Sequence, residues 1–132
     1  MTYSTYVVVN NLVFPESPRW HQDRFWFADQ FTGDVLTLSL DGRVEIVTTL
    51  PDHVGGLDWL PDGTLLAVGM TERLVHRLGP QGLEVYANLS GLAAFHCNDL
   101  LVDAFARCRN RVSARQRQRN FFDGLLKIRR VR

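Results

Sequence analysis

An acidic side chain near the amino terminus is placed where it could bind a cation. Glu16 comes just before the Ser17-Pro18 step, ahead of an apolar segment that is expected to form a strand. A carboxylate at the mouth of such a strand can face the axis around which strands are arranged. Hard cations such as calcium, magnesium and manganese take oxygen ligands there. The alternative interpretation is a surface turn residue.

A second oxygen-bearing pair, Asn98-Asp99, also stands directly ahead of an apolar run. Its amide and carboxylate oxygens suit the same cations, but Asn and Asp also form side-chain turns before strands for local reasons. His96 lies two residues earlier and is the one histidine with a candidate ligand as a near neighbour; the other three are scattered without metal-ligand spacing. Ser17 lies outside any nucleophile-elbow sequence, so no catalytic nucleophile can be named.

These candidates must be positioned by a repeat that runs through the first hundred residues. Residues 20–28 align with residues 59–67 at an offset of 39 without a gap, which places Phe25 over Thr64. A third copy begins at Asn98, with Asp103 over Asp62 at an offset of 41. Repeats of about 40 residues are typical of β-propeller blades.

Each repeat is predicted to contain four short strands. Residues 35–40 alternate between apolar and polar positions and reach residues 44–47 through Asp41-Gly42, a favoured hairpin turn. The sequence therefore predicts an all-β chain: a partial β-propeller of about two antiparallel four-stranded blades plus the start of a third. A stack of unrelated meanders is the alternative. Either arrangement leaves one blade face open, so self-association through that face is expected.

Four segments occur in an order that resembles a known family. They are Phe14-Pro15-Glu16-Ser17-Pro18-Arg19-Trp20, Phe25-Trp26-Phe27-Ala28-Asp29, Gly55-Gly56-Leu57 with Pro61-Asp62-Gly63, and Asn98-Asp99-Leu100-Leu101-Val102-Asp103. Over residues 10–103 the chain resembles the amino-terminal third of the senescence marker protein/gluconolactonase/regucalcin family of six-bladed β-propellers.

The resemblance implies a hydrolase that acts on sugar lactones with a divalent cation: calcium, zinc, magnesium or manganese. Glu16 matches a metal ligand of the family, and Asn98 matches a residue that lines the metal and substrate pocket. His96 stands where the family often has a substrate-contacting Arg, which is a departure. The family's remaining ligands come from later blades and have no counterpart, so this chain is expected to be inactive or nearly so.

The carboxyl-terminal tail differs in charge from the rest of the chain. Residues 1–106 carry a net charge of −8 and residues 107–132 a net charge of +9. We therefore divide the chain into a gluconolactonase-like region, residues 1–103, and an Arg-rich tail, residues 104–132. Residues 107–120 contain neither Pro nor Gly and have helical potential. The tail is a basic arm for nucleic acid or anionic lipid, a solvated helix, or the product of a shifted reading frame, which we favour.

The sequence also predicts the location of the protein and its partners. Two cysteines, Cys97 and Cys108, are too few for a disulfide framework and suit a reducing cytoplasm. The first residues resemble neither a signal peptide nor a membrane span, and we expect no nucleic-acid partner. A small lactone is the partner that the resemblance implies. The alternative function is a β-rich interaction module without catalysis.

Overall fold

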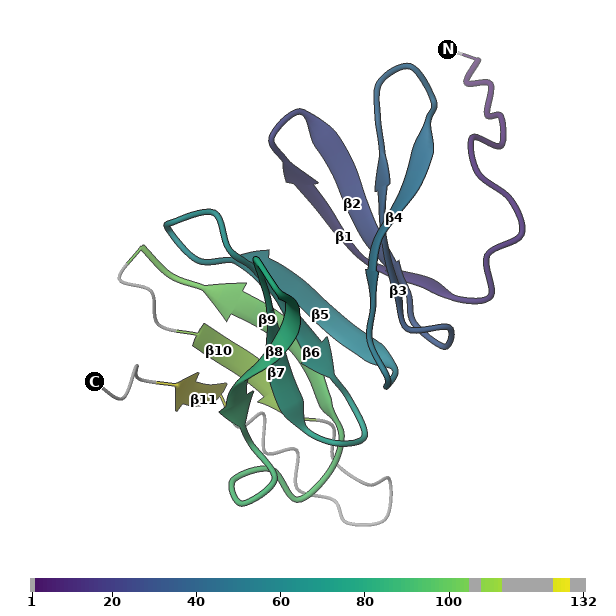
Figure 1. Cartoon of the computed structure of the whole chain (residues 1–132). Helices are drawn as coiled ribbons and strands as arrows, with labels where there is room; N and C mark the ends of the chain where they lie inside the picture. Colours follow the sequence, from purple (N-terminus) through teal and green to yellow (C-terminus); the bar gives the residue numbers. More distant parts are fainter. Residues whose placement is uncertain (1, 105–107, 113–124, 129–132) are drawn as a thin grey trace.

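A computed structural model describes residues 2–104, 108–112 and 125–128, and its elements form three antiparallel sheets in chain order (Figure 1). The first sheet contains β1 (Pro15–His21), β2 (Arg24–Asp29), β3 (Asp34–Leu38) and β4 (Val44–Thr49). The second contains β5 (Val54–Trp59), β6 (Leu65–Gly69), β7 (Leu74–Gly79) and β8 (Gly82–Asn88). The third contains β9 (Cys97–Val102), β10 (Cys108–Val112) and β11 (Leu125–Ile128). The predicted all-β partial propeller is confirmed, and no described element is a helix able to cross a membrane.

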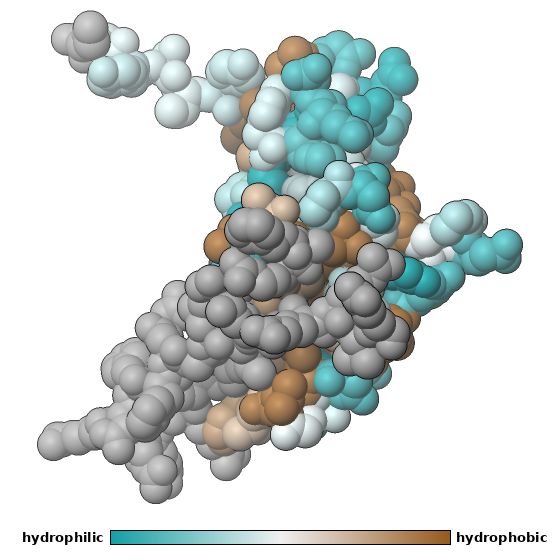
Figure 2. All heavy atoms as spheres, turned by 90° about the vertical axis from the view of Figure 1, so that its left-hand side faces the viewer, coloured by the Kyte–Doolittle hydropathy of each residue, from teal (hydrophilic) through white to brown (hydrophobic). Residues whose placement is uncertain are grey.

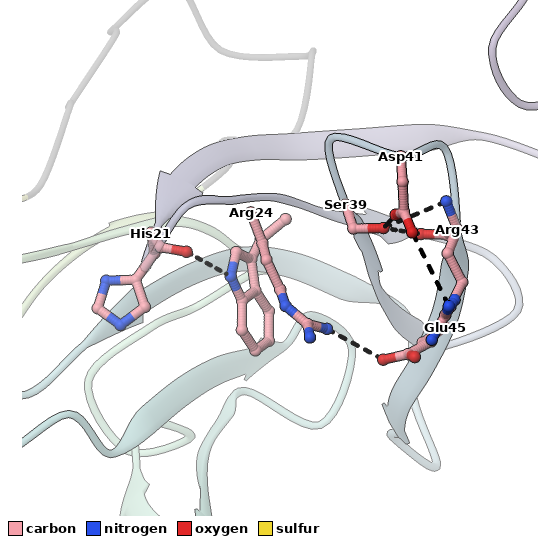
Figure 3. Close-up of polar contacts among 7 residues, drawn as sticks. His21, Arg24, Ser39, Asp41, Arg43 and Glu45 are labelled. Atoms are coloured by element: carbon pink, nitrogen blue, oxygen red, sulfur yellow. Dashed lines mark hydrogen bonds and ion pairs between the residues drawn. The ribbon is translucent and has the colours of Figure 1, made fainter.

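The predicted hairpin between β3 and β4 forms at the Asp41-Gly42 turn, where Gly42 adopts a φ of 84°. The Ser39 hydroxyl donates to the Asp41 carboxylate, and the backbone N–H of Arg43 donates to Ser39 Oγ over 3.2 Å (Figure 3). These local bonds close the turn, because a short polar side chain can pair with the backbone a few residues away.

The first two repeats differ from the gapless alignment by one residue, from their second strands onward. Trp20 pairs with Phe25 in the first sheet, and Trp59 pairs with Leu65 in the second. Phe25 is therefore equivalent to Leu65 at an offset of 40, and its expected alignment with Thr64 is wrong. The cause is that five residues separate the paired Trp59 and Leu65, one more than the four that separate the paired Trp20 and Phe25. A one-residue slip exchanges the two faces of a strand.

The helical potential of residues 107–120 is not realised at Cys108–Val112, which form β10 and pair with β9. The other residues of that range lie outside the described parts of the chain. Cys108 is fully buried in an apolar cluster that also contains Leu100. The tail thus contributes to the third sheet, while the domain boundary at residue 103 and the shifted reading frame stay predictions.

In the part of the chain that the structure describes, the core consists of two apolar clusters, one between each pair of neighbouring sheets. The first joins Ala28 and Val35 of the first sheet to Leu57 and Leu65 of the second. The second cluster joins the other face of the second sheet, through residues such as Val68, to the third sheet. Hydrophobic residues also gather along the middle of the side shown in Figure 2, below a hydrophilic upper part. Each sheet is therefore stabilised chiefly by its neighbours.

Backbone hydrogen bonds link each sheet to the next at equivalent positions. The N–H of Gln30 donates to the Phe14 carbonyl over 2.9 Å, and the Gln30 carbonyl accepts from the N–H of Val54 over 3.1 Å. The N–H of Met70 likewise donates to the His53 carbonyl over 2.8 Å, and its carbonyl accepts from Cys97 over 3.1 Å. The residue after the second strand thus fixes the first strand of its own sheet and of the following one.

We predict that Gly33→Ala destabilises the chain more than Gly42→Ala. Both glycines have φ near 84°, where a side chain costs about 1 kcal/mol. A Cβ on Gly33 would also lie 2.4 Å from the Leu50 carbonyl oxygen, whereas a Cβ on Gly42 would meet no atom within 4 Å. We expect an additional loss of roughly 1–3 kcal/mol for Gly33→Ala in urea unfolding. Equal losses in the two variants would contradict this packing argument.

We predict that His76 makes stability depend on pH. Burial lowers the pKa of its imidazole against the opposing effect of the Glu72 and Asp52 carboxylates, and Nε2 has no hydrogen-bond partner among the described residues. The unfolded chain, with a pKa of about 6.5, then binds the proton more readily, so stability is full above that pH and is lost as the pH falls below it.

Melting temperatures measured between pH 7.5 and 5.5 should therefore fall, and His76→Gln should flatten the decline. The matched control is His96→Gln, because His96 is exposed. An equally steep decline in His76→Gln would assign the pH dependence to other groups.

Candidate functional site

Glu16 and Asn98 occupy the same position in two of the three innermost strands. The inter-sheet backbone bonds make Phe14 equivalent to His53 and Val54 equivalent to Cys97. Counting onward along the chain, Glu16, Gly55 and Asn98 are equivalent positions of β1, β5 and β9, although Glu16 pairs with Ala28 whereas Gly56, the residue after Gly55, pairs with the equivalent Val68. The third repeat therefore follows the second at an offset of 43, and the expected offset of 41 is wrong for this strand. The cause is the loop between β8 and β9, which is longer than the loop between β4 and β5.

These three positions lie next to one another across the inner strands. Ser17 Oγ donates to the Gly55 carbonyl over 3.2 Å, and a Cβ on Gly55 would lie 3.1 Å from the Asn98 Cα. Strand pairing is irregular at this level, with register shifts between Glu16 and Arg19 and between Val54 and Gly56. The row thus has an oxygen-bearing side chain at each end and a glycine in the middle.

Glu16 is exposed, and its Oε2 accepts the backbone N–H of Ser17 over 3.3 Å. It also lines a cavity of about 400 Å³ whose other walls are apolar side chains, including those of Leu12, Phe25 and Phe27. Both roles expected for Glu16, ligand and turn residue, need an accessible carboxylate. The structure places this carboxylate at the rim of the first sheet's outward face.

Asn98 is half-buried in β9, and His96 is exposed in the loop ahead of that strand. Within the described residues, no three or more His, Cys, Asp or Glu side chains form a group able to hold a metal ion. Glu16 and Asn98 offer oxygen donors of the type that calcium and magnesium prefer, but these cations take six or more ligands. Glu16 and Asn98 could therefore supply two of the ligands of such a site.

The two cysteines are buried thiols without a disulfide. Burial raises the pKa of Cys108 to about 11, reinforced by the Asp58 and Asp103 carboxylates. Burial also raises the pKa of Cys97, against the opposing effect of Arg73. A thiol with a raised pKa is a poor nucleophile at neutral pH, so neither cysteine is a candidate for catalysis.

Three residues of the segments quoted above have positioning roles that the sequence did not predict. Arg19 donates to the Leu100 carbonyl over 3.3 Å and so ties β1 to β9. Both oxygens of Asp29 accept backbone N–H groups, from Val13 over 2.8 Å and from Phe14 over 2.7 Å. Gly56, like Gly55, allows close approach of β9. Paired glycines inside a strand were the available signal for such an approach.

In the second sheet, Asp52 fixes the segment that follows β6. Its carboxylate accepts the N–H of Thr71 over 2.8 Å and that of Glu72 over 2.9 Å. Burial by itself would raise the pKa of Asp52, but hydrogen bonds from Thr71, Glu72 and His53 outweigh it and hold the pKa below its usual value. The Asp52 carboxylate therefore has a structural role.

The opposite end of the inner strands is joined by aromatic contacts. The His21 ring stacks on Trp59 with centroids 4.0 Å apart, and Trp26 meets Trp59 edge-on at 5.1 Å. The Trp26 indole N–H donates to the His21 carbonyl over 3.0 Å (Figure 3). Because β1 and β5 are joined at both ends, the level of Glu16 relative to Gly55 is fixed.

Comparison with solved structures finds the same arrangement elsewhere. A gluconolactonase from Xanthomonas campestris superposes with a TM-score of 0.67 at 20% sequence identity, over 80% of this chain and 37% of that protein. A structural genomics target, a candidate gluconolactonase, superposes with a TM-score of 0.62 at 18% identity, over 78% of this chain and 37% of that one. The fold is that of the gluconolactonases. The chain spans little more than a third of either protein.

The resemblance inferred from four sequence segments is thus supported by the fold. No protein-family model and no curated protein sequence matches the chain. At this level of identity the agreement concerns the path of the backbone. The roles of Glu16, Asn98 and His96 stay predictions.

We predict that Gly56→Ala loosens the contact between β5 and β9. A Cβ there would lie 2.6 Å from the backbone nitrogen of Leu100 and 2.9 Å from the carbonyl carbon of Asp99. Because neither atom can move without its strand, the free energy of unfolding should fall by roughly 1–3 kcal/mol. Gly91→Ala is the control, since its Cβ would meet no atom within 4 Å. An unchanged urea midpoint for Gly56→Ala would refute the close approach.

Proposed function

We propose that this chain provides one side of a divalent-metal site for the hydrolysis of a sugar lactone. The observation that carries the proposal is the equivalence of Glu16 and Asn98, two oxygen donors at the same level of two inner strands that lie on either side of β5. The shared fold with a protein described as a gluconolactonase supports it. Calcium, zinc, magnesium and manganese are the candidate cations.

In this proposal Glu16 supplies the negative charge that holds the cation, and Asn98 supplies a neutral amide oxygen for the cation or the substrate. The bound cation would contribute Lewis acidity, which polarises the carbonyl group of a lactone. His96 lies exposed in the loop before Asn98, where an imidazole can donate to a sugar hydroxyl. Glu16, Asn98 and His96 thus serve binding and orientation.

We also propose that a single copy of the chain does not hydrolyse lactones. Two protein ligands leave most of a hard cation's coordination shell to water, so both affinity and substrate orientation are weak. This reasoning favours a role that depends on further blades. A cytoplasmic location, consistent with two buried thiols, and the lack of a nucleic-acid partner remain part of this proposal.

The second candidate function is a β-rich interaction module. It is favoured by the outward face of the first sheet, where Trp20, Val44 and Ile46 are exposed although they are large and apolar. Contiguous apolar surface of this kind marks interaction sites. Unlike the metal proposal, this function does not depend on Glu16, so substitution at Glu16 separates the two.

We predict that the monomeric chain binds Mn²⁺ weakly and through Glu16. In isothermal titration of a dilute sample, Glu16→Gln should lower the Mn²⁺ affinity at least about tenfold, because one charged ligand is lost. Glu45→Gln is the matched control: Glu45 is also exposed and pairs with Arg24 over 3.0 Å, away from the inner strands. Gluconolactone turnover should be undetectable in the parent and both variants.

Two results would contradict the proposal. Equal Mn²⁺ affinity in the parent and Glu16→Gln would remove Glu16 as a ligand. Micromolar affinity together with turnover, both abolished in Glu16→Gln, would show that a single copy is already a complete enzyme.

A further inference from the structure

The cavity of about 400 Å³ beside Glu16 lies between the amino-terminal segment and the outward face of the first sheet. Val9 and Leu12 of the segment line one side, and Phe25 and Phe27 of β2 line the other. In Figure 1 the purple amino-terminal trace runs past the first sheet before it enters β1. The volume is in the range of pockets that hold small ligands.

The side of the cavity formed by the sheet is aromatic. The Phe25 and Phe27 rings have centroids 5.7 Å apart and planes inclined by 29°. Phe27 is only 4% exposed, whereas Phe25 is 37% exposed. The face of an aromatic ring carries partial negative charge, so it attracts a cation as well as an apolar group.

A single carboxylate adjoins this aromatic wall. Among the described residues that line the cavity, Glu16 is the one with an ionisable side chain. Within the described parts of the chain, no basic side chain forms an ion pair with it. Its Oε2 accepts the N–H of Ser17 over 3.3 Å, and a carboxylate has about four acceptor positions, so a ligand can use the others. Beside apolar walls, which exclude water, the attraction between opposite charges is strengthened.

The amino-terminal segment is fixed to the sheet next to the cavity. The Asp29 carboxylate is buried and accepts the N–H groups of Val13 over 2.8 Å and Phe14 over 2.7 Å. The Phe14 carbonyl in turn accepts the N–H of Gln30 over 2.9 Å. Because Leu12 directly precedes these bonds, the wall to which it contributes is held against the sheet.

The second sheet differs from the first at the positions that build the cavity. Ala67 is the equivalent of Phe27, and Gly55 and Gly56 stand at the level of Glu16. Ala67 is buried in the cluster that the second sheet shares with the first. The aromatic ring and the carboxylate are therefore particular to the first sheet, on whose outward face the described structure places the amino-terminal segment.

We propose that this cavity binds an organic ammonium ion that carries an apolar group, such as an arylalkylammonium ion. The apolar group lies between Leu12 and the rings of Phe25 and Phe27, and the ammonium group donates hydrogen bonds to the Glu16 carboxylate. Burial of the apolar group supplies affinity, and the charge pair supplies the preference for a cation. A divalent metal and a sugar lactone each lack this combination, so the inference goes beyond the proposed function and does not rest on it.

The test is isothermal titration of the full chain at neutral pH with three probes of similar shape: phenylbutylammonium, phenylbutanol and phenylbutyrate. The ammonium ion should bind at least about tenfold more tightly than the alcohol, and the carboxylate most weakly, because Glu16 attracts the cation and repels the anion. In Glu16→Gln the ammonium ion and the alcohol should bind alike. Glu45→Gln, which removes an exposed carboxylate paired with Arg24, is the matched control and should keep the preference.

A second variant tests where the ammonium ion binds. Val9→Trp places a large ring in the cavity and should weaken binding of both the ammonium ion and the alcohol. Val13→Trp is its matched control, because Val13 belongs to the same segment, is 62% exposed and does not line the cavity. If circular dichroism shows that Val9→Trp is unfolded, nuclear Overhauser effects in the parent give the location: the phenyl protons of the bound ion should contact the methyl groups of Leu12 and Leu38.

Three results would overturn the proposal. The first is no binding of the ammonium ion at millimolar concentration. The second is equal affinity for the ammonium ion and the alcohol in the parent, or a preference that persists in Glu16→Gln, because either result removes the charge pair. The third is binding that Val9→Trp leaves unchanged, or phenyl contacts with other methyl groups alone, because the ion would then bind elsewhere.

The metal proposal fails or succeeds separately. Glu16-dependent binding of the ammonium ion without Mn²⁺ binding keeps this inference and contradicts the proposed function. Glu16-dependent Mn²⁺ binding without binding of the ammonium ion does the reverse.

Discussion

The structure depends on a pair of backbone hydrogen bonds that recurs at each junction between sheets. Gln30 and Met70 each donate to the residue just ahead of the first strand of their own sheet and accept from the first residue of the next sheet's first strand. Because these bonds involve the backbone alone, they persist although the two residues differ in side chain. They set the level of each inner strand and hence the level of any group carried on it.

Side chains then determine how closely the sheets approach. Gly55 and Gly56 let β5 lie against the backbone of β9, where any Cβ would meet atoms closer than 3.0 Å. Ala28 and Val35 allow the second sheet to pack on the first. Burial against a neighbour is the main source of stability for such a sheet. A terminal sheet with an apolar outward face therefore lacks the neighbour that would bury that face.

The candidate chemistry follows from the same arrangement. At the level of Glu16, β1 and β9 each offer one side chain, and β5, which has Gly55 there, offers none. A cation site built in this way draws its ligands from several sheets, and its quality depends on how many sheets surround the axis. Function and assembly are therefore linked: the strands that hold Glu16 and Asn98 acquire further ligands only through contact with other sheets.

Much of the fold followed from the sequence, because turn chemistry and alternation are local. The Asp41-Gly42 hairpin and the four-stranded repeat were predicted from neighbouring residues, whereas the roles of Glu16 and Asn98 as donors stay predictions. What only the tertiary structure decided was register: one extra residue between Trp59 and Leu65 made Leu65 the equivalent of Phe25, and the length of the loop before β9 made Asn98 the equivalent of Glu16. Pairing of β10 with β9 likewise overrode the helical potential of residues 108–112. Register and pairing are settled by hydrogen bonds between distant segments, and spacing along the chain does not encode these directly.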